Sequence, residues 1–136
     1  MSGFERTGWR DQALSERHRR WGRDCPGCDI DLLMLEYHRA EPIAVIEFKA
    51  EGAPRPDLAH PNYRATAELA TRARIPFFIA VYTRDWIFTT FPGNELAEAW
   101  VSAGQRFSEA AFVSLLYDLR GLQPPTEVLA MCGGAR

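Results

Sequence analysis

Two apolar segments separated by a short polar one most constrain how this chain can fold. Residues 30–37 (IDLLMLEY) and 43–49 (IAVIEFK) are rich in the aliphatic and β-branched side chains that strands favour. The intervening HRAEP has a length typical of a hairpin loop. We therefore expect these two segments to form an antiparallel hairpin, with its loop centred near residues 39–40.

Helices are predicted on both sides of this hairpin. Residues 9–20 (WRDQALSERHRR) are helix-permissive, and Gly22 follows as a stop signal. A loop with three prolines, residues 51–62, leads to an alanine-rich second helix over residues 62–74. Asn62 is the expected N-cap of that helix.

The second half of the chain continues the sheet and then becomes helical. Residues 76–83 form a continuous apolar run, which is typical of a central strand. Because a helix precedes it, this strand is expected to run parallel to the strand before it. Residues 85–91 are predicted to form the next strand. Residues 95–121 have helical composition, and the tail after them is expected to be irregular.

Together these elements predict a single α/β domain over residues 1–136, with a mixed central β-sheet flanked by helices. An odd number of cysteines, Cys25, Cys28 and Cys132, argues against a disulfide framework. No apolar run reaches the roughly 18 residues that span a bilayer, and the N-terminus lacks a signal-peptide core. We therefore expect a cytoplasmic protein that makes no use of a membrane.

Charged side chains interrupt the apolar hairpin at one end. Glu47 and Lys49 share a face of their strand, because side chains alternate along a strand. If the numbers of cross-strand partners sum to about 80, Asp31 lies opposite Lys49 and one diagonal step from Glu47. Charges on buried strands are costly unless they are paired or bind a metal. Asp29 is either a further metal ligand or simply a polar residue entering the strand.

Neighbouring carboxylates repel each other unless a cation lies between them. Mg²⁺ takes one or two carboxylates plus water and substrate phosphate, and Mn²⁺ can replace it. Such an ion generates a nucleophile and offsets negative charge on a phosphate. Lys49 would then orient or deprotonate the attacking water, or neutralise charge on the phosphate. The alternative is a solvent-facing ion pair of Glu47 and Lys49, which does not explain the position of Asp31.

Asp31, followed by a strand, a turn and a strand ending in Glu47-Phe48-Lys49, resembles the D…(D/E)-x-K signature of the PD-(D/E)XK nuclease superfamily. The resemblance implies a restriction-endonuclease-like αβββαβ core over residues 9–91, followed by C-terminal helices. It also implies a Mg²⁺-dependent deoxyribonuclease, with Asp31 and Glu47 as metal ligands and Lys49 as a catalytic residue.

Two further features of this superfamily concern its first helix and its third strand. Many members carry an additional catalytic glutamate on the first helix, for which Glu16 is the best match here; the alternative is that Glu16 is a helix-surface residue. Only two strands are predicted before the second helix, so the third would have to lie near Leu58 or arise from another pairing.

Within the superfamily, the chain is most similar in general character to small Holliday-junction resolvases and phage-type nucleases. These are single-domain proteins of similar length with an N-terminal helix and an I-E-x-K strand. The resemblance implies a homodimer that cuts junction or branched DNA in recombination or repair. Such resolvases often carry a Gly/Ser-rich stretch before the aspartate, whereas this chain has Cys25-Pro26-Gly27-Cys28. A zinc-stabilised interaction domain built on these two cysteines is an alternative.

The formal net charge is −2, so the chain as a whole does not form a basic surface for DNA. Residues 17–23 (RHRRWGR) nevertheless hold four arginines and one histidine, which can contact phosphates or form a solvated helix face. The residues expected to contact the DNA backbone are Arg17, His18, Arg19, Arg20, Arg23 and Arg64. A non-catalytic nucleic-acid-binding or assembly module on the same fold is the alternative function, and it predicts a broken catalytic triad.

Overall fold

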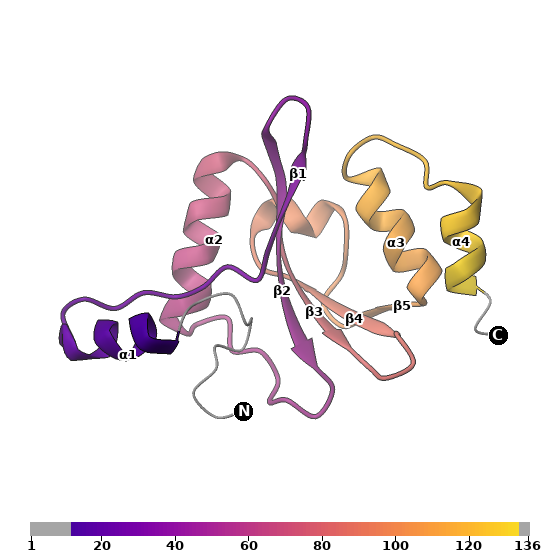
Figure 1. Cartoon of the computed structure of the whole chain (residues 1–136). Coiled ribbons are helices and arrows are strands. Elements are labelled where there is room, and N and C mark those ends of the chain that lie inside the picture. Colours follow the sequence, from indigo (N-terminus) through magenta and orange to yellow (C-terminus); the bar gives the residue numbers. More distant parts are fainter. Residues whose placement is uncertain (1–11, 134–136) are drawn as a thin grey trace.

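A five-stranded mixed β-sheet forms the centre of the structure, a computed structural model that describes residues 12–133 (Figure 1). The strands lie side by side in chain order: β1 (Leu32–Glu36), β2 (Glu41–Ala50), β3 (Phe77–Tyr82), β4 (Phe88–Pro92) and β5 (Gln105–Phe107). Strands β2 and β3 are parallel, and the other neighbouring pairs are antiparallel. The prediction of an α/β fold with a mixed sheet and a parallel central pair is confirmed.

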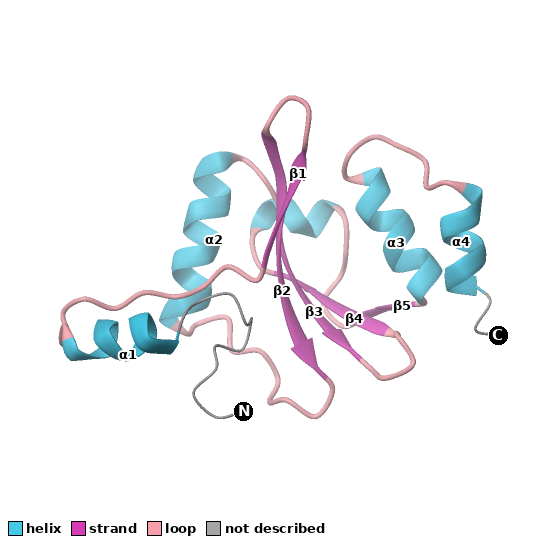
Figure 2. Cartoon of the chain, viewed as in Figure 1, coloured by secondary structure: helices cyan, strands magenta, loops and turns pink. Residues whose placement is uncertain are grey.

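Helices cover both faces of this sheet (Figure 2). The helical elements of the described region are α1 (Gln12–Arg20), α2 (Pro61–Ala73), the 3-10 helix η1 (Glu95–Ala99), α3 (Glu109–Asp118) and α4 (Thr126–Gly133). Helix α2 lies on one face of the sheet, whereas α3 and α4 lie on the other (Figure 1). Helix α1 lies away from the sheet, near the N-terminal end of α2. Within residues 12–133, no helix is both long and apolar enough to cross a membrane.

Alternation along the strands divides the core into two clusters, because successive side chains face opposite sides of the sheet. Ala44, Ile46 and Phe78 belong to the cluster under α3 and η1. Val45 and Phe77 belong to the cluster under α2. The strand β3 is buried over its first four residues, which confirms the prediction of a central strand in this segment.

The hairpin register differs from the sequence prediction. The chain turns over residues 37–40, where Ala40 adopts a left-handed φ of 54°, so the centre of the turn lies earlier than expected. Leu32 therefore pairs with Ile46, and a bulge follows between Met34 and Leu35. Continued to the next residue, this register places Asp31 level with Glu47, so the prediction that Asp31 lies opposite Lys49 was wrong.

The segment between β2 and α2 also differs from what was expected. It contains no strand, and Leu58 lies in a turn, so the third strand sought there is absent from residues 51–60. Pro54 and Pro56 lack the N–H that a strand ladder requires. The N-cap of α2 is His60 rather than Asn62, because Pro61 occupies the first helical turn.

Two elements of the C-terminal region were missed. The strand β5 has only three residues, too few for a period to be recognised, and it pairs with β4. The tail that was expected to be irregular contains α4, whose Cys132 is buried. Burial raises the pKa of the Cys132 thiol, and the Glu109 carboxylate raises it further. Cys25, Cys28 and Cys132 are all free, which agrees with the expectation that the chain has no disulfide framework.

A close approach between two strands gives a test of this packing. The Gly93 amide donates to the Phe77 carbonyl at 2.6 Å, and a Cβ at Gly93 would overlap the buried Phe77 ring. Gly93→Ala is expected to lower the free energy of unfolding by about 1–3 kcal/mol, as overpacking typically does. Urea denaturation measures this loss.

The control for this substitution is Gly27→Ala, because its Cβ would meet only His18 Cε1 at 3.5 Å, an ordinary contact. This change is expected to stay within about 0.5 kcal/mol of wild type. Equal stability of the two variants would contradict the described packing of β3 against residue 93.

Candidate active site

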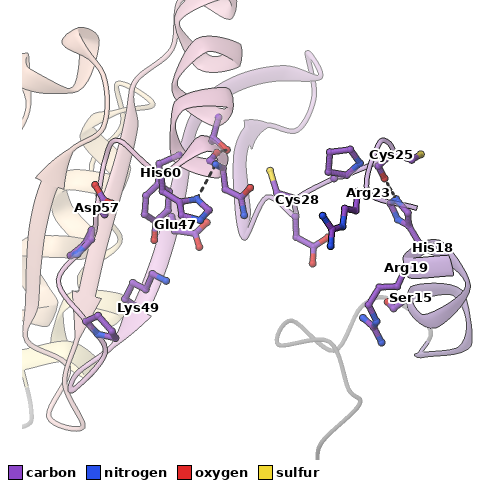
Figure 3. Close-up of a pocket in the computed structure, with 18 of the residues that line it drawn as sticks. Ser15, His18, Arg19, Arg23, Cys25, Cys28, Glu47, Lys49, Asp57 and His60 are labelled. Carbon is purple, nitrogen blue, oxygen red and sulfur yellow. Dashed lines mark hydrogen bonds between the residues drawn. The ribbon is translucent and has the colours of Figure 1, made fainter. Parts of the chain in front are cut away.

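A cleft of about 780 Å³ lies at the carboxyl end of β2 (Figure 3). One wall comes from β2, the proline-rich segment 54–57 and the start of α2, and the other comes from α1 and the loop after it. In Figure 3, Glu47, Lys49 and His60 lie on the first wall and face Arg19 and Arg23 across the opening. Segments more than twenty residues apart in the chain thus contribute to one cavity.

Glu47 and Lys49 are the charged residues that β2 contributes to this cleft, and both are partly buried. They lie two positions apart on the strand and so share the face that α2 covers. The Lys49 Nζ lies 5.7 Å from the centroid of the Tyr63 ring on α2, within the range of a cation–π contact. The prediction that Glu47 and Lys49 share one face of their strand is confirmed.

Lys49 is also the only lysine of the chain, since the other fifteen of its sixteen Lys and Arg residues are arginines. A lysine ammonium can give up a proton far more readily than a guanidinium, which stays protonated throughout the physiological pH range. The only lysine of the chain therefore lies in the cleft that Glu47 also lines.

Asp31 lies just before β1 and is partly buried. Its Oδ2 accepts a hydrogen bond from the Phe48 amide at 3.0 Å. The carboxylate thus satisfies a β2 donor at the point where pairing with β1 ends. Asp31 is consequently held at the same end of the hairpin as Glu47, but its side chain is not part of the cleft lining.

The remaining acidic residues of the prediction separate into two groups. Asp29 lines the cleft from the loop before β1. Glu16 does not: it is exposed on α1, where it accepts a hydrogen bond from Gln12 Nε2 at 3.1 Å. The structure therefore brings Asp29, Glu47 and Lys49 to one cavity and leaves Glu16 outside it.

The donors of the cleft suit a cation with few protein ligands. Among residues 12–133, no three His, Cys, Asp or Glu side chains gather closely enough to hold a metal ion. A four-ligand zinc site that includes Cys25 and Cys28 thus finds no support in the described part of the chain. Mg²⁺ needs only one or two carboxylates, with water and substrate completing its shell. The carboxylates that line the cleft are those of Asp29, Glu47 and Asp57, and Asp31 lies outside the lining at the same end of the hairpin.

The basic residues predicted to bind DNA are also divided. Arg19 and Arg23 line the cleft, whereas the exposed side chains of Arg17, Arg20 and Arg64 lie outside its lining. His18 lines the cleft as well, but its Nε2 is 2.6 Å from the Cys25 carbonyl oxygen, to which it donates. That bond ties the loop after α1 back to the helix, so His18 shapes this wall.

Three charged or titratable residues of the cleft were missed by sequence reasoning: Arg55, Asp57 and His60. All three belong to the proline-rich segment before α2, which was interpreted only as a loop. Arg55 stands between two prolines and lies over the Phe91 ring, with its Cζ 5.6 Å from the ring centroid. Asp57 Oδ1 accepts from the Ala59 amide at 3.0 Å and so closes a turn before His60. The sequence signal that could have indicated these residues is an arginine between two prolines, Pro54 and Pro56.

No known protein family, characterised protein or solved structure matches this chain significantly. What supports a function is therefore the chemistry of the side chains that meet at the cleft.

The hydrogen bond between Asp31 and Phe48 predicts that the Asp31 side chain stabilises the fold as an acceptor. Asp31→Ala leaves the Phe48 amide without its acceptor and is expected to cost about 1–3 kcal/mol of unfolding free energy. Asp31→Asn keeps a side-chain carbonyl that can accept this bond, so its cost is expected to be smaller. Urea denaturation of both variants measures the difference.

Asp24→Ala is the matched control, because Asp24 is an exposed aspartate in a loop. It is expected to change stability by less than about 0.5 kcal/mol. If Asp31→Ala were as stable as Asp24→Ala, the bond to Phe48 would make no contribution to the fold.

Proposed function

We propose that the chain is a metal-dependent endonuclease of the PD-(D/E)XK type that hydrolyses DNA phosphodiester bonds. The observation that carries this proposal is the position of Glu47 and Lys49. They occupy the same face of β2 at its carboxyl end, inside a cleft that arginines also line. Asp31 is anchored beside them through the Phe48 amide.

The order of elements agrees with such a nuclease in part. Helix α1, the β1–β2 hairpin, α2 and the parallel strand β3 follow one another as in the αβββαβ core, with one strand fewer before α2. Glu47 and Lys49, which resemble the (D/E)-x-K part of the superfamily's signature, lie near the end of the second strand of the hairpin, and Asp31 lies just before the first. These are grounds for a restriction-endonuclease-like interpretation of the α/β sheet.

The proposed metal is Mg²⁺, with Mn²⁺ able to replace it, held by Asp31 and Glu47 with Asp29 as a third candidate ligand. When bound, the ion supplies an activated water and positive charge beside the phosphate. Asp31 presents one carboxylate whose Oδ2 is already oriented by the Phe48 amide. Glu47 would contribute its carboxylate from the wall of the cleft that β2 forms.

The side chains of the chain itself would perform the remaining tasks. Lys49, steadied against the Tyr63 ring, would take or give a proton at the attacking water and offset charge on the phosphate. Arg19, Arg23 and Arg55 border the same cleft and would hold the neighbouring phosphates of the backbone. Glu16 has no part in this arrangement, because it is exposed on α1, where it accepts a hydrogen bond from Gln12.

The substrate and assembly implied by the resemblance are part of the proposal. We expect preference for junction or branched DNA, and a homodimer that places two clefts on one substrate. The edge strand β1 offers an apolar surface for association, since Leu33 and Leu35 are exposed there.

A non-catalytic nucleic-acid-binding module is the second candidate. It is favoured by the absence of a three-ligand metal group among residues 12–133 and by the absence of a cleft-facing Asp31. Such a module would bind DNA through Arg19, Arg23 and Arg55 without cutting it.

Cleavage assays with Mg²⁺ separate these two functions. Purified protein is incubated with linear duplex, single-stranded, flap and four-way-junction DNA. Wild type is expected to cut at least one of these substrates, and EDTA is expected to stop it. Lys49→Ala and Glu47→Gln are each expected to lower the rate by at least about 100-fold, as loss of a group in general acid–base or metal-ion catalysis typically does.

Two matched variants sharpen the result. Lys49→Arg keeps the charge and is expected to fail nearly as completely as Lys49→Ala, because a guanidinium stays protonated at neutral pH and cannot act as a base. Glu41→Gln alters an exposed glutamate at the opposite end of β2 and is expected to cut like wild type. DNA that is bound but left uncut by the wild type under all metal conditions would favour the non-catalytic module.

A further inference from the structure

His60 occupies two positions at once, the N-cap of α2 and the wall of the cleft. Its backbone is extended, with φ −61° and ψ 136°, as an N-cap requires. Its Nδ1 accepts a hydrogen bond from the Asn62 amide at 3.1 Å. The ring also lines the cleft on the same wall as Glu47 and Lys49 (Figure 3).

The capping bond determines which ring nitrogen carries the proton. A nitrogen that accepts from a backbone N–H has no proton of its own, so Nδ1 is the bare nitrogen of the neutral ring. The proton consequently resides on Nε2. His60 therefore offers one hydrogen-bond donor, on the ring edge that the cap does not use.

Capping alone does not account for a histidine at this position. Asn, Asp, Ser and Thr are the preferred N-caps, and any of them would accept from the Asn62 amide with a smaller side chain. The other two caps for which the structure gives a side-chain bond, Asn94 of η1 and Ser108 of α3, follow that preference. His60 differs from these caps in having a second ring nitrogen, and of the three caps it is the one that lines the cleft.

The surroundings hold the ring in place. The His60 amide donates to the Asp57 carbonyl at 3.0 Å, and the His60 carbonyl accepts from the Arg64 amide at 3.0 Å. The ring meets Tyr63 edge to face, with the centroids 6.3 Å apart. Because Tyr63 also contacts the Lys49 ammonium, His60 and Lys49 border the same aromatic ring.

We propose that His60 is a substrate-binding residue whose Nε2–H donates to a phosphate oxygen of a nucleic-acid strand in the cleft. A phosphate is the chemical class that fits, because Lys49 and Arg55 line the same cleft and attract an anion, while a neutral imidazole adds a directional donor. The carboxylates of Glu47 and Asp57 also line this cleft, so the anion would be held on its cationic side chains. The proposal rests on the proposed function insofar as the strand bound there is the one that is cut. It adds a residue that the D…(D/E)-x-K signature does not contain.

His60→Ser tests the donor while preserving the cap, because a serine hydroxyl oxygen can accept from the Asn62 amide. The affinity for fluorescently labelled single-stranded and duplex DNA is measured in EDTA, so that no cleavage occurs. His60→Ser is expected to weaken binding by about 10- to 100-fold, which corresponds to the loss of one hydrogen bond to a charged group. Its melting temperature is expected to match that of the wild type.

His60→Ala and Ser108→Ala serve as comparison variants. His60→Ala removes both the cap and the donor, and it is expected to lose stability as well as affinity. Ser108→Ala removes a cap on the opposite face of the sheet, and it is expected to lose stability alone. Wild-type affinity in His60→Ser, together with lower stability in His60→Ala, would overturn the proposal and leave His60 as a cap only.

The same measurements distinguish this proposal from the proposed function. If the wild type binds DNA but does not cut it, hydrolysis is refuted, and weaker binding by His60→Ser still supports the phosphate contact. If the wild type cuts DNA and His60→Ser binds and cuts equally well, the role of His60 alone is refuted. If the wild type binds no nucleic acid at all, both proposals fail.

Discussion

The parallel pairing of β2 with β3 determines where a binding site can form in this molecule. Parallel neighbours require a crossover, and here it consists of the proline-rich segment and α2. The crossover leaves β2 at its carboxyl end, so the start of α2 returns beside the same strand end that carries Glu47 and Lys49. In open α/β sheets, this is the edge at which ligands bind. The arginines of α1 and its following loop complete the second wall.

The carboxyl end of β2 belongs to the sheet and yet carries charged side chains, two features that usually conflict. A sheet centre excludes charge, and Val45 and Ile46 are accordingly buried. The next residues of β2 lie where β1 has stopped pairing, and the Asp31 carboxylate satisfies the amide that is left over. One acidic side chain thus completes the hydrogen bonding of the sheet while a second, Glu47, remains in the cleft. Charge is tolerated there because solvent and opposite charges reach it.

Local patterns predicted much of this arrangement, and long-range packing decided the rest. The alternation of the 43–49 segment was enough to place Glu47 and Lys49 on one face, since that depends only on strand geometry. The cross-strand register depended on a turn whose length the sequence did not specify, so the partner of Asp31 was misassigned. Arg55 and His60 were missed because their place in the cleft depends on how the proline-rich segment folds back beside β2.

Crystals grown with Mn²⁺ would test the central claim most directly, because anomalous scattering locates the ion without reference to any assay. We expect one manganese ion per chain at the carboxyl end of β2, coordinated by the carboxylates of Glu47 and Asp31, and its loss from crystals of Glu47→Gln. Crystals grown in excess Mn²⁺ in which the ion lies elsewhere, or in which no ion is bound, would contradict the account.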